Sequence, residues 1–381
     1  MPQVVIVGGG PAGAAAGITL ARLGLRPSVL EARPCPELKV GECLPPSAGP
    51  ILEQLGLCDG LQHDGHLPSY GNRSIWGSST PVERDFIFGT QGHGWLLDRL
   101  KFEAALALKA QEAGVDWRYG HRLTACSRRD GRMALSFQSA SGSVTLEADF
   151  LVDATGRAAR IARTFGAQQL RYDRLIGAAL LLKAPAGKGI QDSLTLVEAV
   201  SSGWWYSARL PDDKLMLVYL SDSDLVDQRA READGLLALL ESTDHTLRRV
   251  RDGGGDRGGY SPLGGPRIQQ AGSSRLDAVA GHGWVAVGDA AAAFDPLSSY
   301  GISSAMGSGF YAAMAVVDFL SGNTDALTSY QKLIDDAYAQ YLLMHYDYYS
   351  LERRWPDELF WQRRHAREPL RQSAGQEMSV E

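Results

Sequence analysis

The sequence predicts an α/β protein in which a parallel sheet with flanking helices is joined to an antiparallel sheet and followed by C-terminal helices. Two observations carry the prediction. The N-terminal stretch VVIVGGGPAGAAAGITLARLGLRPSVLEA is a complete strand, glycine turn, helix and strand unit, which is typical of a doubly wound parallel sheet. Farther along, residues 175–220 contain four short strand-like segments in succession, which favours antiparallel pairing.

The composition is that of an ordinary globular protein, with 381 residues, 44% hydrophobic and 22% charged residues and a formal net charge of -6. An acidic chain has no general attraction for nucleic acid or anionic membranes, so we expect neither partner. No apolar run approaches the roughly 20 residues of a membrane span. Because MPQ leads directly into a strand without a basic segment, we expect no cleavable signal and a cytoplasmic location.

The four cysteines show neither a CxxC pair nor a metal-ligand spacing. This pattern predicts free thiols in a reducing compartment and no metal site. Only Cys43, in VGECLPP, lies in a stretch that is expected to approach a functional site.

The N-terminal unit predicts a cradle for the pyrophosphate of a dinucleotide. Its GxGxxG turn supplies glycines where a tight turn, close approach of the ligand and close helix packing are needed. The pyrophosphate would lie at a helix N-terminus, whose free N–H groups and dipole favour an anion. Glu31 ends the second strand, where a carboxylate can accept both ribose hydroxyls of an adenosine, which favours unphosphorylated ribose. The expected contacts are Gly8, Gly10, Pro11, Ala12, Gly13, Glu31 and Ala32.

Two later motifs favour FAD over NAD. FLVDATGRAARIAR (150–163) is a strand that ends at Asp153, and GWVAVGDAAAAFDPLSSYGIS (283–303) is a strand that ends at Gly288-Asp289. Together with the glycine turn, and in this order, they resemble the flavoprotein monooxygenases of the para-hydroxybenzoate hydroxylase type and their relatives, the flavin-dependent halogenases and geranylgeranyl reductases. The resemblance covers most of the chain and implies a Rossmann-like FAD-binding domain of the glutathione-reductase type.

The resemblance also implies how the rest of the cofactor is held. Asp289 can bind a ribityl hydroxyl, and the N–H groups at Gly301 and Ile302 would face the pyrimidine edge, which becomes anionic on reduction. The remaining expected contacts are Arg99, Asp153, Gly156, Gly288 and Pro296. For Arg99, a surface salt bridge is the alternative. The sequence lacks a second strand–GxGxxG–helix unit, so NAD(P)H would visit transiently or an external donor would deliver electrons.

The order of the motifs predicts that two units alternate along the chain. The FAD-binding unit is expected in three parts, 1–72, 99–174 and 266–322, and the antiparallel-sheet substrate unit in two, 73–98 and 175–265. Residues 323–381 are expected to form a C-terminal helical region.

The segment GWWYSARLP (203–211) places three large aromatic side chains in one predicted strand. Because neighbours in a strand face opposite sides, Trp204 and Tyr206 share one face and Trp205 takes the other. We expect Trp204 and Tyr206 to line a cavity over the flavin, where a flat ring can stack on them, and Trp205 to pack in the core. The reverse assignment of the two faces stays open.

The same segment argues against halogenation. Flavin-dependent halogenases carry Gly-Trp-x-Trp-x-Ile-Pro here, whereas this chain has its second tryptophan at Trp205 and its proline only at Pro211. The family also uses a lysine between the first cofactor motif and the Arg99 helix, and the sequence has none between Lys39 and Lys101. The nearest basic residue is Arg73, whose guanidinium cannot supply the chemistry of an amine. Halogenation is kept as an alternative.

Four stretches, VGECLPPSAGPILEQLG, DATGRAARIAR, GWWYSARLP and RRWPDELFW, look like the flavoproteins of the LodB and GoxB type, which modify a tryptophan of a partner oxidase on the way to a tryptophylquinone. The resemblance implies an FAD-dependent monooxygenase that hydroxylates an aromatic ring through a flavin hydroperoxide. The substrate would be an indole, either free or as a tryptophan of a partner protein. His93, in TQGHGW, and Glu42 are the candidate proton-handling groups, with a loop histidine and a solvated charge as their alternatives.

Two further functions stay open. The arginine- and tryptophan-rich segment 353–364 suits an FAD-binding redox or maturation partner that works by docking another protein. A reductase of isoprenoid double bonds would need a long apolar tunnel in place of stacking aromatics.

Overall fold

A computed structural model describes residues 1–37, 39–253 and 259–366. The end of the expected C-terminal helical region, 367–381, lies outside the described residues. The fold is α/β, as the sequence predicts, and it combines a mainly parallel sheet with a larger antiparallel sheet.

The parallel sheet has β1 at its centre and the order β21-β22-β12-β1-β2-β8. Its strands are short, rich in valine and largely buried, because helices and a second sheet cover its two faces. Only the edge strand β21 runs antiparallel to its neighbour. The bounds are β1 Val4–Val7, β2 Ser28–Leu30, β8 Asp116–Arg118, β12 Phe150–Asp153, β21 Ala280–Gly281 and β22 Trp284–Ala286.

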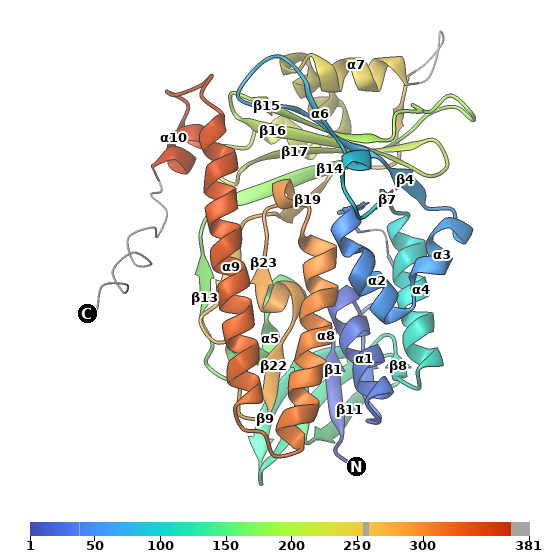
Figure 1. Ribbon diagram of the computed structural model, residues 1–381, viewed down its shortest axis with the longest axis vertical. Helices are drawn as coiled ribbons and strands as arrows, with labels where there is room; N and C mark the ends of the chain where they lie inside the picture. The colour runs from blue at the N-terminus through green and yellow to red at the C-terminus, as the bar shows by residue number, and fades with distance from the viewer. Residues whose placement is uncertain (38, 254–258, 367–381) are drawn as a thin grey trace.

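Helices α1 and α8 pack closely along this sheet, and α9 runs beside α8 from the far end of the molecule up to the antiparallel sheet (Figure 1). A Cβ atom on Gly309 of α8 would overlap the carbonyl oxygen of Ala12, so the contact requires glycine. The helix bounds are α1 Pro11–Arg22, α4 Arg99–Glu112, α8 Gly301–Leu320 and α9 Ala326–Leu351.

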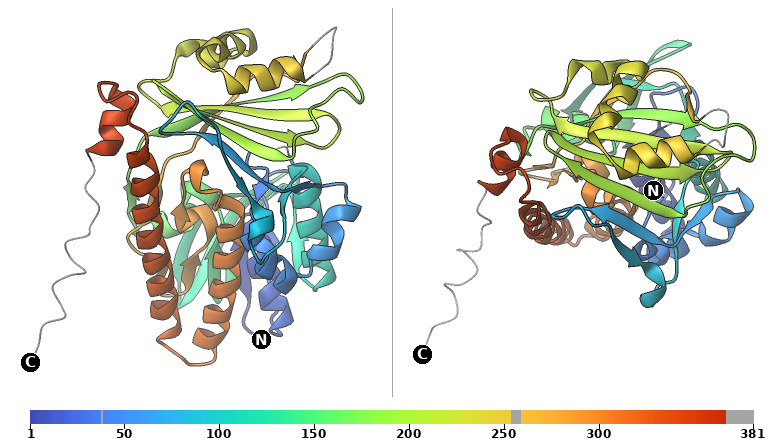
Figure 2. Two further views of the ribbon diagram at one scale, coloured as in Figure 1. Left: turned by 45° about the horizontal axis from the view of Figure 1, so that its top comes forward. Right: turned by 90° about the horizontal axis from the view of Figure 1, so that it is seen from above.

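The antiparallel sheet lies across one end of the parallel-sheet unit, with α6 and α7 on its outer face (Figure 2). Strands β15, β16 and β17 form a meander, and β14 pairs with β17 on its far side. Strand β5 joins in parallel beside β15, and β6 forms the edge. The segment 71–85 therefore belongs to this sheet, whereas β7 (Gly94–Leu96), also within the predicted 73–98, pairs with β3 and β4 instead. The chain leaves the sheet later than residue 265, because β19 still pairs with β14. The bounds are β5 Gly71–Ile75, β6 Val82–Asp85, β14 Leu175–Lys183, β15 Leu194–Val200, β16 Gly203–Leu210, β17 Lys214–Asp222, β18 Ser261–Pro262 and β19 Arg267–Gln270.

Among the described residues, the other elements are short helices and three small antiparallel sheets of three strands each, β11-β10-β9, β13-β20-β23 and β3-β7-β4. The first of these sheets packs behind the parallel sheet. The bounds of all these elements are α2 Gly49–Leu55, α3 Cys58–His63, α5 Arg160–Thr164, α6 Ala233–Leu239, α7 His245–Asp252, α10 Leu359–His365, β3 Cys43–Leu44, β4 Leu67–Ser69, β7 Gly94–Leu96, β9 Arg122–Arg129, β10 Arg132–Ser139, β11 Gly142–Ala148, β13 Gln169–Arg171, β20 Ser274–Leu276 and β23 Ala292–Ala293.

Three expectations from composition can be compared with the structure. All four cysteines are free thiols. Within the described residues, no helix is both long and apolar enough to cross a membrane. The same part of the chain holds no group of three or more histidine, cysteine or acidic side chains arranged for a metal ion.

The contact between α1 and α8 gives a first prediction. Gly309→Ala should lower the free energy of unfolding by about 1–3 kcal/mol, because the added methyl group meets the backbone of Ala12. Gly307→Ala on the same helix is the control, since no heavy atom lies within 4 Å of its Cβ position. Alanine there should stabilise the protein by about 0.5–1 kcal/mol. Urea denaturation measures both, and equal responses would contradict the assigned packing.

Candidate active site

The glycine turn has the geometry of a ligand cradle. Gly8 has a φ of +112°, and a Cβ atom on it would overlap the carbonyl oxygen of Ala154. A Cβ on Gly13 would overlap the carbonyl oxygen of Gly8, so these two glycines serve backbone packing. Gly10 instead faces open space, where the nearest atom to its Cβ position is the Lys39 ammonium at 3.9 Å. An open backbone beside a cation fits a pyrophosphate.

Glu31 lies over this turn. Its carboxylate accepts hydrogen bonds from the backbone N–H groups of Gly9 at 2.7 Å and Arg33 at 2.9 Å. Pro11 and Ala12 form the first turn of α1, and Ala32 is half-buried directly after the strand.

The Gly288-Asp289 turn meets the same end of α1. Gly288 has a φ of +58°, and a Cβ on it would lie 2.7 Å from the Cβ of Ala12. Asp289 is 38% exposed and forms an ion pair with Arg157 at 3.4 Å, close to Gly156, whose φ is +67°. The structure therefore brings together residues that lie far apart in the sequence.

Asp153 requires a correction, because it does not offer its carboxylate to a ligand. The side chain is fully buried, and its two oxygens accept four hydrogen bonds from the loop that follows the strand. The donors are the N–H and hydroxyl of Thr155 and the N–H groups of Ile161 and Ala162. Asp153 therefore shapes the loop that carries Gly156.

The start of α8, where the sequence predicts contacts to the flavin, is open and uncapped. Pro296 opens a short 3-10 turn (Pro296–Ser298), and Gly301 is the first residue of the helix. Gly301 is exposed, no atom lies within 4 Å of its Cβ position, and no side chain caps the helix. The side chain of Ile302 is buried at 7% exposure. The first N–H groups of the helix have no partner within the helix, and we expect them to be available to a ligand beside the exposed Gly301.

Arg99 makes its contacts inside the protein and not at the surface. It is buried, pairs with Glu103 and donates from Nη1 to the carbonyl oxygens of Val40 at 2.9 Å and Gly41 at 2.7 Å. These bonds fix the turn that immediately precedes Glu42. The alternative of a surface salt bridge is wrong for this arginine.

Glu42 is only 1% exposed, and neither carboxyl oxygen has a hydrogen-bond partner among the described residues. Burial raises the pKa of Glu42 to about 7, against the opposing attraction of Arg99. The solvated-charge alternative is therefore wrong. A buried carboxyl without a donor is costly unless it is protonated or a bound group satisfies it.

A cavity of about 970 Å³ lies next to this turn. One wall comes from the turn at Cys43, a second from the segment around β6 and Phe86–Phe88, and a third from the start of α8 together with α9. A volume of this size accommodates an aromatic ring with room to spare. The lining residues are Cys43, Pro45, Pro46, Ser47, Asn72, Glu83, Arg84, Asp85, Phe86, Phe88, Gly89, Gln91, Gly92, Leu297, Ser298, Ser299, Tyr300, Tyr341, Met344, His345 and Tyr348.

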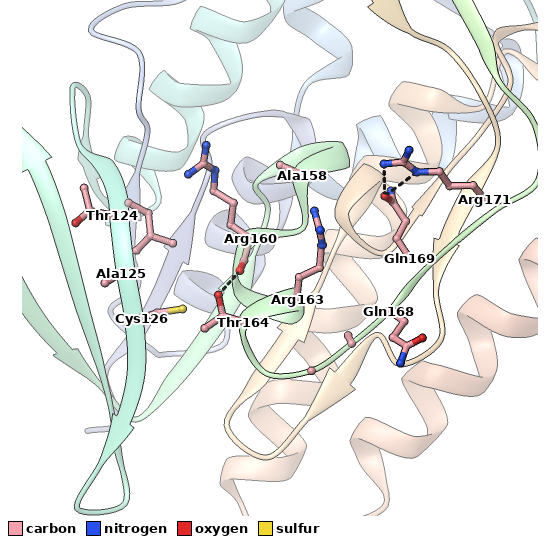
Figure 3. A pocket seen from close by; sticks show the side chains of 13 residues that line it. Thr124, Ala125, Cys126, Ala158, Arg160, Arg163, Thr164, Gln168, Gln169 and Arg171 are labelled. Atoms are coloured by element: carbon pink, nitrogen blue, oxygen red, sulfur yellow. Dashed lines mark hydrogen bonds between the residues drawn. The ribbon is translucent and has the colours of Figure 1, made fainter. Parts of the chain in front are cut away.

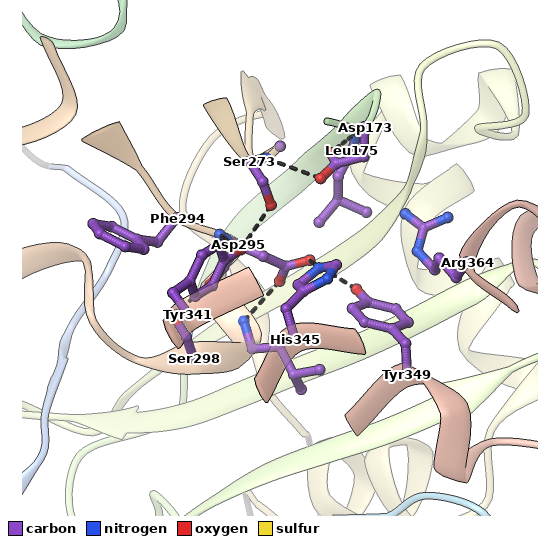
Figure 4. A network of polar contacts seen from close by, with 12 residues as sticks. Asp173, Leu175, Ser273, Phe294, Asp295, Ser298, Tyr341, His345, Tyr349 and Arg364 are labelled. Atoms are coloured by element: carbon purple, nitrogen blue, oxygen red, sulfur yellow. Dashed lines mark hydrogen bonds and ion pairs between the residues drawn. The ribbon is translucent and has the colours of Figure 1, made fainter. Parts of the chain in front are cut away.

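A buried polar network supports the α9 wall of this cavity (Figure 4). Asp295, 1% exposed, accepts hydrogen bonds from the Tyr349 hydroxyl at 2.8 Å and from His345 Nε2 at 3.2 Å. Its backbone N–H donates to the Tyr341 hydroxyl at 2.9 Å. The indole N–H of Trp204 donates to the Tyr349 hydroxyl at 2.9 Å, which extends the network into the antiparallel sheet.

The two neighbouring tryptophans do face opposite sides of the sheet. Trp205 stacks on Tyr219 with 4.9 Å between ring centroids, beneath α6 and α7. The placement of Trp204 needs correction, because it is fully buried among Trp76, Tyr349 and other aromatics and does not line the cavity. It faces the predicted side of the sheet, but the C-terminal helices cover it.

Tyr206 lies on the same side of the sheet as Trp204 and is half-buried. Burial raises the pKa of the Tyr206 phenol well above its ordinary value, and the nearby Cys43 and Glu42 raise it further because their negative forms would repel a phenolate. Tyr206 is therefore close to the Glu42 turn but is not part of the cavity lining.

His93 is exposed, and its ring packs on Trp95 at 4.8 Å and Tyr70 at 5.7 Å. Its Nδ1 lies 2.8 Å from the Gly94 carbonyl oxygen, and the side chain does not line the cavity. The loop-histidine alternative fits this geometry. The histidine that does face the cavity is His345, which sequence analysis did not select; its signal was the four-residue spacing of Tyr341, His345 and Tyr349 on one helix face.

Most of the aromatic side chains of segment 353–364 are buried, so they cannot form a docking surface. Phe360 and Trp361 are buried, and the Trp361 indole N–H donates to the Val200 carbonyl oxygen at 3.0 Å. This observation removes the main support for a protein that works only by docking.

A second hollow, of about 750 Å³, lies between β9 and α5 (Figure 3). Arg160, Arg163 and Arg171 border it, and no acidic side chain is among the described residues that line it. None of the predicted site residues contributes to it.

Several known proteins are similar to this chain over most of its length. LodB of Marinomonas mediterranea, described as an FAD-dependent oxidoreductase, is 30% identical over 368 residues, which cover 96% of this chain and 97% of LodB. The flavin-dependent halogenase CmlS aligns with a TM-score of 0.83 at 26% identity, over 96% of this chain and 68% of CmlS. The peptidyl tryptophan dihydroxylase QhpG, essential for tryptophylquinone cofactor biogenesis, aligns with a TM-score of 0.78 at 26% identity, over 95% and 78% of the two chains. A sequence profile of the tryptophan halogenase family matches residues 78–380.

The open space at Gly10 gives a second prediction. Gly10→Val should leave the melting temperature of the cofactor-free protein nearly unchanged, because its backbone is extended and the Cβ meets only Lys39. The same change should weaken FAD binding by tenfold or more, since the side chain occupies the phosphate position. Fluorescence titration with FAD measures the affinity. A variant that melts early but binds FAD normally would contradict the assignment of Gly10.

The burial of Glu42 gives a prediction for the cofactor-free protein. Its folded pKa of about 7 exceeds the ordinary 4.5, so the unfolded state ionises first as pH rises. Folding stability should therefore fall between about pH 4.5 and 7, by up to roughly 3 kcal/mol, and then stay level. Glu42→Gln should abolish this loss, whereas Glu53→Gln, on the exposed face of α2, should not. Urea denaturation at pH 4.5 and pH 8 measures the stability of the wild type and both variants. An equal change in stability between the two pH values for all three proteins would contradict the burial of the Glu42 carboxyl.

Proposed function

The chain belongs to the tryptophan halogenase family of flavin-dependent enzymes, and from this premise we propose that it hydroxylates an indole ring, that of a tryptophan in a partner polypeptide. The protein is an FAD-dependent oxidoreductase, to which an external donor supplies the reducing electrons. The observation that carries the proposal is the cavity beside the Glu42 turn, which has aromatic walls and a histidine but no lysine among its described lining residues.

The residues present fit FAD. Gly10 with Lys39 would hold the pyrophosphate, Glu31 the adenosine ribose and Asp289 a ribityl hydroxyl. The uncapped start of α8 suits the pyrimidine edge, and the unpartnered Glu42 carboxyl lies at the same end of the site. Reduced FAD and dioxygen together supply an electrophilic oxygen.

The basic groups near the cavity support oxygen transfer over halogen transfer. Lys39 forms an ion pair with Glu103 at 2.5 Å on the cradle side, away from the cavity lining. Arg73 is held by Glu83 and Asp192. Neither arrangement presents the free amine that the halogenase resemblance requires in this segment. The likeness to CmlS keeps halogenation as the second candidate.

The cavity walls would bind and orient a flat ring. Phe86, Tyr300 and Tyr348 offer aromatic faces from three different segments, and each stacking contact stabilises a bound ring by about 0.5–1.5 kcal/mol beyond the area it buries. A ring enclosed by these walls is also shielded from water, which protects a reactive oxygen from side reactions.

The mouth of the cavity favours a polypeptide over a free amino acid. Ile87 is 78% exposed and Phe88 is 91% exposed, on the 3-10 turn that also contributes Phe86 and Phe88 to the lining. Large apolar side chains this exposed at a cavity rim are typical of contact with another macromolecule. The similarity to QhpG, a peptidyl tryptophan dihydroxylase, points in the same direction.

The test is a peptide library with one tryptophan in varied flanking sequences, treated with the FAD-loaded enzyme, a flavin-reducing system, dioxygen and both chloride and bromide. Tandem mass spectrometry should find one or two added oxygen atoms on the tryptophan. A matched library with phenylalanine at that position should stay unmodified. Halogenated indole formed at enzyme-dependent rates would overturn hydroxylation in favour of the second candidate.

The exposed rim supplies a prediction of its own. Replacing both Ile87 and Phe88 with serine should lower kcat/KM for a modified peptide about tenfold or more, because contacts worth at least 1.4 kcal/mol are lost. The same variant should act on N-acetyltryptophanamide at the wild-type rate. The double replacement of Leu108 and Gln111 by serine, both exposed on α4, is the control. Equal losses on peptide and amide would assign the pair to folding rather than to docking.

A further inference from the structure

We propose that His345, oriented by Asp295, is the base that removes the ring proton of the aromatic substrate. The inference rests on the proposed function, which requires an aromatic ring in this cavity. In the sequence His345 is one of eight histidines and belongs to no cofactor motif.

The chemistry requires such a base. When oxygen adds to an aromatic carbon, a C–O bond forms, the oxygen–oxygen bond breaks and its electron pair leaves with the second oxygen, which becomes water. Dioxygen is the oxidant, and the reduced flavin is the source of the two electrons. The ring carbon must then lose its proton, so that the C–H electron pair restores the aromatic system. A positioned base typically speeds such a proton transfer by about 10²–10⁴-fold.

The geometry gives His345 the correct free nitrogen. Its Nε2 lies 3.2 Å from an oxygen of the buried Asp295, so this nitrogen carries the hydrogen and donates it. Nδ1 is then the basic nitrogen, and it has no hydrogen-bond partner within the described ranges. The side chain is 12% exposed and the residue lines the cavity, so we expect a bound ring to approach this nitrogen.

Asp295 is held so that it can stabilise the positive imidazolium. Besides His345, its carboxylate accepts from the Leu297 N–H at 2.8 Å and from the Tyr349 hydroxyl at 2.8 Å. The imidazole also lies between the rings of Tyr341, at 5.6 Å, and Tyr349, at 4.6 Å, which fix its orientation. A carboxylate that orients a histidine through its second nitrogen is a recurrent arrangement in proton-transfer sites.

Other titratable groups of the cavity are poorly suited to this role. Burial raises the pKa of the Cys43 thiol to about 12 and raises that of the Tyr341 phenol well above its ordinary value, so both stay protonated. Glu83 is paired with Arg73, and Asp85 caps the turn at Ile87 by accepting from its N–H. Glu42 is buried outside the cavity lining.

The first experiment compares His345→Ala with His93→Ala, which removes an exposed histidine from outside the cavity. His345→Ala should bind FAD normally and keep consuming dioxygen, with hydrogen peroxide released, while product formation falls about a hundredfold or more. Added imidazole should restore product formation, because it can occupy the vacated space. His345→Gln should show the same loss without rescue, and His93→Ala should match the wild type. Undiminished product from either His345 variant would overturn the proposal, as would a loss in the alanine variant that imidazole does not restore.

A second readout needs no turnover, so it separates this inference from the proposed function. In protein labelled with ¹⁵N-histidine, the His345 signals are those absent from the His345→Ala or His345→Gln variant. N-acetyltryptophanamide, added to the FAD-loaded protein as the probe, should shift the Nδ1 signal and leave those of His93 in place. An unmoved Nδ1 signal at saturating probe would overturn the proposal even if hydroxylation is observed. A shifted signal in an enzyme that halogenates would leave His345 as the base and refute only hydroxylation.

Discussion

The site depends on one steric constraint, the close approach of two chain segments to the first turn of α1. The turn at Gly288 touches Ala12 from one side, and α8 touches the backbone of the same residue at Gly309. Neither contact tolerates a side chain. Because the segments pack this closely, the exposed backbone at Gly10, the Asp289 carboxylate and the free start of α8 come to one end of the parallel sheet. The arrangement is the usual one for ligand sites in open α/β sheets, at the carboxyl ends of the strands.

A second constraint joins this end to the antiparallel sheet. Asp295 follows β23, yet the Tyr349 hydroxyl connects it by hydrogen bonds to Trp204 near the start of β16. The C-terminal segment adds Arg364, which pairs with the buried Asp222 at 2.9 Å. Each of these polar groups would be costly to bury alone, and together they satisfy one another. The α9 wall of the cavity is therefore fixed relative to both sheets by partners distant in sequence.

Sequence analysis succeeded where a local pattern determines structure. The glycines of the first turn, the acidic end of β2 and the period-two alternation of Trp204 and Trp205 follow from rules that involve neighbouring residues only. It failed where long-range pairing decides. Asp153 was expected to contact the ligand, but its carboxylate accepts hydrogen bonds from the loop that follows its own strand. Trp204 is covered by helices that begin more than a hundred residues later. His93 and His345 could not be distinguished from composition, because only the packing of α9 on the cavity makes one of them a lining residue.

The two ends of the site are also linked through one buried arginine. Arg99 pairs with Glu103, which in turn pairs with Lys39 beside the open backbone of Gly10. The Nη1 group of Arg99 donates to the carbonyl oxygens of Val40 and Gly41, and thereby holds the turn that precedes Glu42. An anion at Gly10 attracts Lys39 in competition with Glu103, and any shift of Glu103 acts on Arg99. The unpartnered Glu42 carboxyl and the Lys39 cation therefore belong to one electrostatic chain. For this reason we propose that Arg99 supports the proposed cofactor site without facing it.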